Sequence, residues 1–410
     1  MPVSCSPRAA LEASSRSRAT SSSARRTSPT SSSRTYGPEQ ILAYAIGRPS
    51  EGFGEPYRVF DEERVIARLP GPPFLFVDRV THVAEEPFVL ARTDWVHSEW
   101  DVDPGAWYFA GGASQTMPFC IFLEAALQPC GWLAAYLGSA LRSDGQLHFR
   151  NLEGGATLHR ELDPSIGTVH SRVRLTSFSE AGGMIIQNFD LELSQGGRVI
   201  YEGWTRFGFF PTASLKAQIG IRDAGDRLYL PEGPVRSIPL ARRAPLNPDE
   251  AAACGVPSSE RLELPPGALL MLDTIEDLRL DQGPAGLGYA QGSMTVDPSA
   301  WFFAAHFYQD PVIPGSLGLQ SFIQLMKALA IERWPALVET HRFEAIALGR
   351  EHTWIYRGQV VPENERVEVR CWVDSVEEGD EPVLVASGFL LADGKPIYEM
   401  KKFPIRLVRQ

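Results

Sequence analysis

Two segments of this 410-residue chain carry apolar side chains at helical spacing. In the segment after Pro314-Gly315-Ser316 they recur every three or four positions and share one helical face. These side chains are Leu319, Phe322, Ile323, Met326 and Leu329. The Pro-Gly-Ser sequence is a typical start signal, so the helix is expected to begin there. Pro118 opens a similar apolar stretch, which Pro129 is expected to bend.

Polarity alternates from one residue to the next in 168–178, 366–376 and 382–392, and this pattern predicts strands. Before each helix, a further strand is expected to end at Trp107 or at Trp301. One apolar helix followed by several antiparallel strands indicates an α+β fold, with a sheet wrapped around the helix. Two such units are expected to pack edge to edge.

The two helical segments belong to an internal repeat, because three motifs return in the same order at offsets between 194 and 197 residues. The pairs are FLFVDRV (74–80) with LLMLDTI (269–275), VDPGAWYFA (102–110) with VDPSAWFFA (296–304), and GGRVIYEGWTRFGFFP (196–211) with DGKPIYEMKKFPIRLV (393–408). A period this long indicates duplication of a whole domain rather than a solenoid of short repeats.

The repeat divides the chain into a first copy, residues 37–211, and a second copy, residues 261–410. Residues 212–260, rich in Pro, Ala and Arg, are interpreted as the connection between them. Residues 1–36 are rich in Ser and Arg and have almost nothing apolar to bury, which predicts a disordered leader. This acid-poor composition also fits an organelle transit peptide, and the alternative stays open.

Charge and cysteine content restrict the class of protein. The net charge is −11, although the leader alone carries six arginines against one acid. The acidic remainder argues against nucleic acid as the main partner. Five scattered cysteines with no CxxC pair favour reduced thiols in a cytoplasmic protein over a disulfide framework or a zinc site. No run of roughly 18 apolar residues is evident, so no membrane span is expected.

The longest motif lies in WFFAAHFYQDPVIPGSLGLQSFIQL (301–325), where HF-x-x-DPV-x-PG-x-LGL extends from His306 to Leu319. It resembles the 3-hydroxydecanoyl-carrier-protein dehydratase/isomerase family of bacterial fatty acid synthesis. With MPFCIFLEAALQPCGWLAAYLGSAL (117–141), the two-copy arrangement resembles more narrowly the dehydratase regions of polyunsaturated fatty acid synthases. The resemblance covers residues 37–410 and implies a double hotdog fold, in which two hotdog units build one active site.

The resemblance implies dehydration of 3-hydroxyacyl thioesters to trans-2-enoyl thioesters, and the family also permits double-bond isomerisation. The substrate would be carried on the phosphopantetheine of an acyl carrier domain, with no metal or redox cofactor. The implied partners are this carrier and other fatty acid synthase domains, and the chain is expected to be a monomeric pseudo-dimer or a homodimer. Because carrier domains are usually acidic, a basic patch is expected, with Arg342, Arg350 and Arg357 as candidates.

The chemistry of dehydration explains which residue types are needed. A base must remove the proton alpha to the thioester carbonyl, and His306 is the candidate. Backbone N–H groups at a helix start can hold the carbonyl oxygen, which makes Gly315 the candidate donor. Alternatively, a lone histidine in an apolar segment is a packed core residue, and Gly315 only permits a tight turn.

The acid that protonates the departing hydroxyl is expected from the other copy. In the family, a carboxylate lies six residues after the proline of the PG pair. Counted from Pro314 this position is Gln320, which cannot donate a proton as an acid; counted from Pro118 it is Glu124. The first copy has no histidine that matches His306. Each copy thus keeps what the other lacks, and one composite site is predicted unless Glu124 is an exposed helix residue.

Eight further residues near these positions are expected to line the acyl tunnel or the core beside it. They are Trp301, Phe307, Tyr308, Val312, Pro314, Phe119, Cys120 and Gln320. Cys120 lies near a helix start and could alternatively be a nucleophile with a lowered pKa. The remaining histidines have no metal-ligand spacing and receive no role; they are His82, His97, His148, His159, His170, His341 and His352.

Two other functions stay open at this point. A thioesterase on the same fold would hydrolyse the thioester with a carboxylate and water, although the motif from His306 to Leu319 argues against it. A catalytically silent pair of hotdog units would act as a scaffold or acyl-binding module within a megasynthase. The presence of His306 and Glu124 in opposite copies argues against such silence.

Overall fold

The computed structural model describes residues 33–110, 117–162, 165, 167–233, 238–239 and 267–410. Most of the predicted leader lies outside the described residues, and so do residues 240–260 of the predicted connection. The described part begins with a correction. Residues 34–36, placed in the disordered leader, form β1 (Arg34–Tyr36), which pairs with β2 (Arg79–Val83). Tyr36 stacks edge-on against Trp132 with 5.1 Å between ring centroids, and composition alone could not reveal this contact.

The other elements follow in chain order. The helices are α1 (Pro38–Ile46), α2 (Pro49–Phe53), η1 (Glu55–Tyr57), α3 (Val59–Glu62), α4 (Trp107–Ala110), α5 (Phe119–Tyr136), η2 (Ser139–Arg142), α6 (Thr212–Lys216), α7 (Ala224–Arg227), α9 (Trp301–Ala305), α10 (Gly315–Arg333) and η4 (Pro335–Leu337). The strands are β3 (Val96–Asp101), β4 (Leu147–Leu158), β5 (Thr168–Ala181), β6 (Met184–Gln195), β7 (Arg198–Pro211), β8 (Ile238–Pro239), β9 (Thr274–Arg279), β10 (Tyr289–Thr295), β11 (His341–Phe343), β12 (Glu351–Tyr356), β13 (Arg366–Glu377), β14 (Val383–Ala392) and β15 (Lys395–Arg409).

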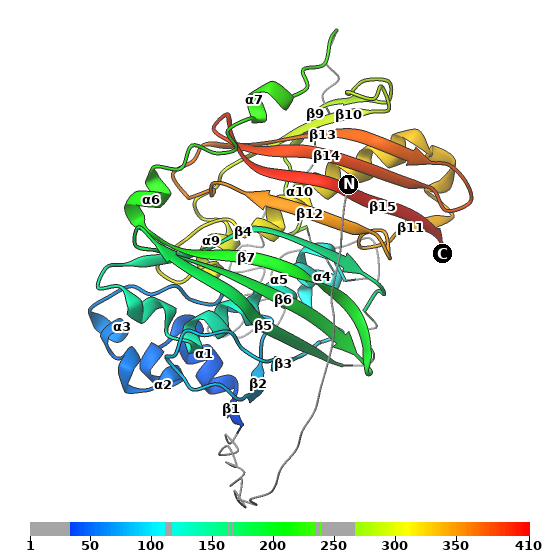
Figure 1. Cartoon of the computed structure of the whole chain (residues 1–410). Helices are drawn as coiled ribbons and strands as arrows, with labels where there is room; N and C mark the ends of the chain where they lie inside the picture. Colours follow the sequence, from blue (N-terminus) through cyan, green and yellow to red (C-terminus); the bar gives the residue numbers. More distant parts are fainter. Residues whose placement is uncertain (1–32, 111–116, 163–164, 166, 234–237, 240–266) are drawn as a thin grey trace, which may run out of the picture. The chain divides into compact units, whose positions relative to one another are not determined.

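The strands join into one antiparallel sheet, in the order β1-β2-β3-β5-β6-β7-β4-β12-β15-β14-β13-β10-β9-β8, with β11 attached to β15. β4 of the first copy pairs with β12 of the second. The strand order outward from this seam is equivalent in the two copies (Figure 1). It is β7, β6, β5, β3 and β2 in the first copy, and β15, β14, β13, β10 and β9 in the second. The predicted double hotdog, with two units packed edge to edge, is therefore confirmed.

Each copy wraps its strands around one long apolar helix. α5 contacts β3, β5, β6 and β7, α10 contacts β9, β10, β13, β14 and β15, and the two helices contact each other. Both helices begin directly after a proline, Pro118 or Pro314, as predicted. Pro129 lies inside α5, which continues beyond it to Tyr136. Apolar side chains surround α5 on all sides, which is typical of a buried helix.

Among the described helices, α5 is the one that is long and apolar enough to cross a membrane by length and composition. No run of roughly 18 apolar residues was evident in the sequence, and no membrane span was expected. In the structure, 94% of this segment is buried inside the fold. Its apolar composition is therefore explained by the core that it forms with the sheet.

The two copies repeat each other down to side-chain contacts. Gln128 of α5 donates to the Phe74 carbonyl at 2.8 Å and accepts the Phe76 N–H at 2.7 Å. Gln324 of α10 makes the same pair of bonds with the segment 269–271, at 2.5 and 3.0 Å. Each glutamine thus fastens the repeated segment before the first strand of its copy to the central helix.

Trp107 and Trp301 do not end strands as expected; they begin the short helices α4 and α9. The side chain of Asp103 accepts the N–H of a residue two positions later at 2.8 Å, and Asp297 does the same at 2.9 Å. Such aspartate-centred turns end a strand and start a new direction of the chain. The repeated Val-Asp-Pro sequence is therefore a strand stop rather than a strand interior.

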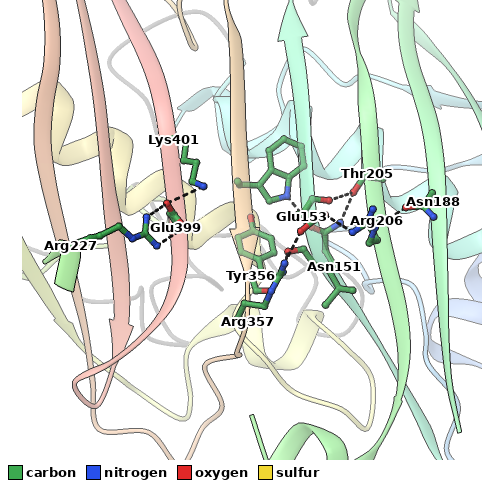
Figure 2. Close-up of polar contacts among 12 residues, drawn as sticks. Asn151, Glu153, Asn188, Thr205, Arg206, Arg227, Tyr356, Arg357, Glu399 and Lys401 are labelled. Carbon is green, nitrogen blue, oxygen red and sulfur yellow. Dashed lines mark hydrogen bonds and ion pairs between the residues drawn. The ribbon is translucent and has the colours of Figure 1, made fainter. Parts of the chain in front are cut away.

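Polar contacts connect the copies along the β4–β12 seam, as Figure 2 shows. Glu153 of β4 accepts from Arg206 of the first copy at 2.7 Å and from Arg357 of the second copy at 2.6 Å. The indole N–H of Trp354 in β12 donates to Asn151 in β4 at 2.8 Å. The seam is thus a continuous sheet with side-chain bonds across it, not a loose contact between two domains.

The predicted connection contains structure of its own. α6 and α7 lie in it, and β8 pairs with β9 at the edge of the second copy. Ile221 and Ala224 pack against Phe389 and Leu391 of β14. Residues 221–228 therefore pack on the outer surface of the second copy, whereas α6 contacts β7 of the first copy.

Candidate active site

A cavity between the copies brings the two predicted catalytic side chains together. Its lining atoms enclose about 840 Å³, including the open mouth. The first copy contributes Glu124, Gln128, Gly131, Phe149 and Arg150, among others; the second contributes His306, Phe307, Val312, Gly315, Ser316, Tyr356 and Tyr398, among others. Glu124 and His306 are 182 positions apart in the chain, yet both face this one space.

His306 follows α9 directly and is buried. Its Nδ1 lies 3.1 Å from the carbonyl oxygen of Val312. A carbonyl only accepts, so Nδ1 carries the proton in the neutral ring and Nε2 has a free lone pair. Burial lowers the pKa of His306 to about 3, against the weaker opposing effect of the Val312 hydrogen bond. The imidazole is therefore neutral at pH 7 and can accept a proton at Nε2.

Glu124 projects from α5 and is also buried, which excludes the alternative of an exposed helix residue. The hydroxyl of Ser316 donates to Oε1 at 2.7 Å, and Gln128 Nε2 lies 3.2 Å from Oε2. Burial raises the pKa of Glu124 to about 7, although both hydrogen bonds act to lower it. A large fraction of this carboxyl is therefore protonated near neutrality and can serve as an acid.

Gly315 is the first residue of α10 and lines the cavity beside Ser316. A Cβ at this position would lie 2.6 Å from the ring of Tyr356, so only glycine fits here without displacing that ring. The first N–H groups of a helix have no partner within the helix and carry its positive dipole end. The amides at this helix start can therefore hold a developing negative charge on a carbonyl oxygen.

A hydrogen-bonded network around Asp310 fixes the loop after His306, and it was not predicted from the sequence. Asp310 accepts two hydrogen bonds from Arg150, both at 2.7 Å, and one from His148 at 2.9 Å. Burial acts to raise the pKa of Asp310, but His148 and Arg150 outweigh it and hold the pKa well below its usual range. Asp310 was visible in the DPV motif, whereas nothing in the sequence paired it with residues about 160 positions earlier.

Tyr356 and Tyr398 also line the cavity and were not predicted. Their rings lie 4.3 Å apart, and the buried hydroxyl of Tyr356 has no hydrogen-bond partner among the described residues. Tyr356 stands at the end of β12, next to the seam, as labelled in Figure 2. The repeat could not identify Tyr356 as a cavity residue, because the two copies differ in length before β12.

Three of the predicted tunnel residues lie at or beside the cavity, and two lie elsewhere in the second copy. Phe307 and Val312 line it, and Pro314 caps α10 next to it. Trp301 instead packs against Phe74 and Trp107, at 5.4 and 5.3 Å between ring centroids. Tyr308 is 42% exposed, with the Arg68 guanidinium 5.4 Å from its ring centre. Trp301 therefore belongs to the packing around the site, whereas Tyr308 lies at the surface.

The remaining three predicted tunnel residues lie outside this cavity; they are Phe119, Cys120 and Gln320. Phe119 packs against His352 and Phe403 in the core, and with Gln320 it lines a second cavity. Cys120 is fully buried, and burial raises the pKa of its thiol. A buried thiol with a raised pKa is a poor nucleophile, which favours the alternative of a small core residue for Cys120.

The three arginines proposed for a basic patch each have an acidic partner. Arg342 is paired with Glu161 at 2.8 Å, Arg350 with Glu377 at 2.5 Å and Arg357 with Glu153 at 2.6 Å. Arg357 belongs to the seam between the copies, where its charge helps to hold the two copies together. The structure gives none of the three an uncompensated charge with which to attract an acidic carrier.

Comparison with known proteins places the chain among its relatives. The model of the FabA-like domain matches residues 69–203 and 264–401, one segment in each copy. Over 388 residues the chain is 31% identical to a subunit of the polyunsaturated fatty acid synthase of Thraustochytrium sp.. The match covers 90% of this chain and 26% of that protein, so the chain spans about a quarter of its relative's length.

Solved structures with a similar chain course include a dehydratase domain of a trans-AT polyketide synthase from Brevibacillus brevis, 11% identical, with a TM-score of 0.41 over 80% of this chain and 98% of that one. An acyl-CoA thioesterase II from Mycobacterium marinum is 13% identical, with a TM-score of 0.41 over 77% of this chain and 93% of that one. Likenesses this weak support no further argument. The two matched segments together cover most of the chain, which therefore belongs to the FabA-like domain family, with one domain in each copy.

Proposed function

We propose that the chain dehydrates 3-hydroxyacyl thioesters to trans-2-enoyl thioesters at the cavity between the copies. One observation carries the proposal: His306 of the second copy and Glu124 of the first line the same cavity, at the N-terminal end of α10. A neutral buried imidazole and a buried carboxyl that is about half protonated at pH 7 provide a base and an acid for this elimination, and each comes from a different copy.

Atoms and electrons balance in the proposed reaction. Nε2 of His306 takes the proton from the carbon alpha to the thioester carbonyl, and the electron pair forms the new double bond. The bond from the beta carbon to the hydroxyl breaks, and Glu124 protonates the departing oxygen to give water. The amides at Gly315 and Ser316 hold the carbonyl oxygen while negative charge develops on it. Passage of the proton from the imidazolium to the carboxylate then restores the starting state.

The resemblance and the curated relative support the choice of substrate class. The relative is a polyunsaturated fatty acid synthase subunit, which agrees with an acyl chain as the substrate. We propose that the substrate arrives on the phosphopantetheine of an acyl carrier domain, with other synthase domains as further partners. The proposed chemistry uses no metal or redox cofactor, because both proton transfers are assigned to side chains of this chain.

The test is dehydration of a 3-hydroxyacyl pantetheine thioester by the purified chain, followed by the absorbance of the enoyl thioester. Activity that is lost in His306→Ala and in Glu124→Gln, and kept in Gln320→Ala, supports one composite site. Full activity in Glu124→Gln with loss in Gln320→Ala would show that the acid is misassigned. Release of free thiol without an enoyl product would indicate a thioesterase, and no activity at several chain lengths would indicate a silent module.

A further inference from the structure

The molecule holds a second cavity at the position that the repeat relates to the first. It is lined by Gln320, Gln324 and Lys327 of α10, which stand 196 positions after Glu124, Gln128 and Gly131 of α5. Its lining atoms enclose about 1400 Å³, including the open mouth. The duplication has therefore kept two cavities, although the residues within them have diverged.

The second cavity lacks groups that the first one uses. Gln320 replaces the acid, and Phe119 stands where the repeat places Gly315, since both lie five residues before Glu124 and Gln320 respectively. The ring of Phe119 packs edge-on against His352, 4.9 Å between centroids, and fills the helix start. A thioester carbonyl therefore cannot reach the N–H groups at the start of α5 as it can reach those beside Gly315 at the start of α10.

Instead, the second cavity contains a lysine. Lys327 occupies the position of Gly131, and its Nζ lies 5.3 Å from the ring centre of Phe343. Among the described residues, no carboxylate acts on the pKa of this lysine, and it contacts the ring of Phe343. Burial lowers the pKa of Lys327, against a weaker opposing effect of the Cys120 thiol, because no carboxylate nearby stabilises the ammonium form. An anion placed beside it would supply the missing counter-charge.

The rest of the lining is mainly apolar, and part of it reaches the surface. The apolar side chains are Leu269, Leu270, Ile331, Trp334, Val338 and Leu407. Ile331 and Val338 are each 44% exposed, so this part of the wall is open to a ligand that enters from the surface. Arg342 and His341 also line the cavity, but Arg342 is paired with Glu161 at 2.8 Å and His341 Nε2 lies 2.8 Å from the Asp380 carbonyl oxygen. Lys327 is therefore the unpaired basic side chain among the described lining residues, and the apolar wall beside it fits a ligand with one anionic head and a long hydrocarbon chain.

We propose that this second cavity binds a long-chain carboxylate, with the carboxylate against Lys327 and the hydrocarbon chain along the apolar wall. The site is distinct from the proposed active site and does not depend on the reaction assigned to it. A free fatty acid has both features, and the cavity would hold it without chemistry, as a regulatory or storage site.

The experiment is isothermal titration of the full chain with oleate, below its micelle concentration, and with oleyl alcohol as the uncharged probe. Lys327→Met is expected to weaken oleate binding about tenfold or more, because a charge-assisted contact in a buried site is lost. Lys327→Arg should keep most of the affinity, since it keeps the charge. Oleyl alcohol should bind the parent and Lys327→Met equally.

The control for location is Glu124→Gln, which alters the first cavity and is expected to leave oleate affinity unchanged. Dehydration by Lys327→Met should equal that of the parent, so failure of either proposal can be told from failure of the other. Equal oleate affinity of Lys327→Met and the parent overturns the inference. Loss of oleate binding in Glu124→Gln, or no binding by the parent, overturns it as well.

Discussion

The two cavities of this molecule occupy equivalent positions in a duplicated fold, yet they differ in almost every chemical group. The first has a carboxyl from α5, an imidazole after α9 and a glycine at the start of α10. The second has Gln320, Lys327 and the ring of Phe119 at the corresponding helix positions. Once two copies share one chain, a single complete site suffices, and the other is free to change.

The difference also shows where a symmetric fold can tolerate asymmetry. Contacts that hold each copy together are kept on both sides, as with Gln128 and Gln324, which make matching bonds to equivalent backbone groups. Contacts that serve chemistry are kept on one side only. The pseudo-symmetry of the scaffold and the asymmetry of its cavities therefore reflect two different constraints on the same helices.

The largest expected effect is loss of the base. His306→Ala should lower kcat for dehydration by about 100-fold to 10,000-fold, the usual contribution of a positioned proton-transfer group. The measurement is the initial rate of enoyl thioester formation from a pantetheine substrate. A fall of less than about threefold would remove the main chemical difference between the two cavities.

The next largest expected effect is a loss of stability when the Arg150–Asp310 pair is broken. It tests whether this pair holds the first cavity in shape. Both side chains are nearly buried, with 11% and 12% exposed. Arg150→Met leaves the Asp310 carboxylate buried without its main partner, and this typically costs about 3–5 kcal/mol of unfolding free energy. Chemical denaturation measures this loss of unfolding free energy. The matched control is Arg142→Met, which removes an exposed ion pair with Glu180 and should cost less than about 1 kcal/mol.

A smaller loss of stability is expected from a change in the β4–β12 seam, which borders the first cavity. A Cβ on Gly154 would lie 2.3 Å from the ring of Trp354 across the β4–β12 pair. Gly154→Ala should therefore cost about 1–3 kcal/mol through overpacking. The thermal midpoint measures the change. Gly196→Ala at a β6–β7 turn, with φ of +56° but open space, separates backbone strain from this side-chain clash.

The pH dependence of the first cavity follows from its two pKa values. Glu124 must be protonated to act as an acid, so kcat/KM should fall about tenfold per pH unit above its pKa of about 7. His306 must be neutral to act as a base, and with a pKa of about 3 it stays so across the accessible range. A 3-acetoxyacyl substrate, whose leaving group needs no acid, should lose the decline at high pH.

The smallest expected effect is restoration of the missing acid in the second cavity. Gln320→Glu in a His306→Ala background should leave the rate at the residual level, because the described residues around that cavity include no second histidine placed like His306 and the helix start is filled by Phe119. A recovered rate, measured with the same enoyl assay, would mean that the second cavity keeps more of the machinery than its lining suggests.

Much of this could be predicted from the sequence because it is encoded locally or repeated. The helix starts at Pro118 and Pro314 follow from backbone restrictions that act within a few residues. The strands at 168–178 and 366–376 follow from alternating burial on a sheet with two different faces. The motif around His306 and the count to Glu124 identified the pair that the cavity brings together.

Other features depend on residues that are far apart in the chain. Ser316 bonds Glu124 across 192 positions, and Arg150 reaches Asp310 across 160. The strand at residues 34–36 is held by the contact of Tyr36 with Trp132, which lies on the central helix of the first copy. No periodicity records such contacts, since each partner alone looks like an ordinary polar or aromatic residue.

The sequence by itself determined the duplication, the class of fold and the types of residue available for proton transfer, because these follow from repeated motifs and local patterns. Only the tertiary structure decided that Glu124 is buried with a raised pKa, that His306 is neutral, and that Lys327 has no counter-charge among the described residues. The physical reason is that pKa and charge compensation depend on desolvation and on neighbours in space, and both arise only when the two copies pack together.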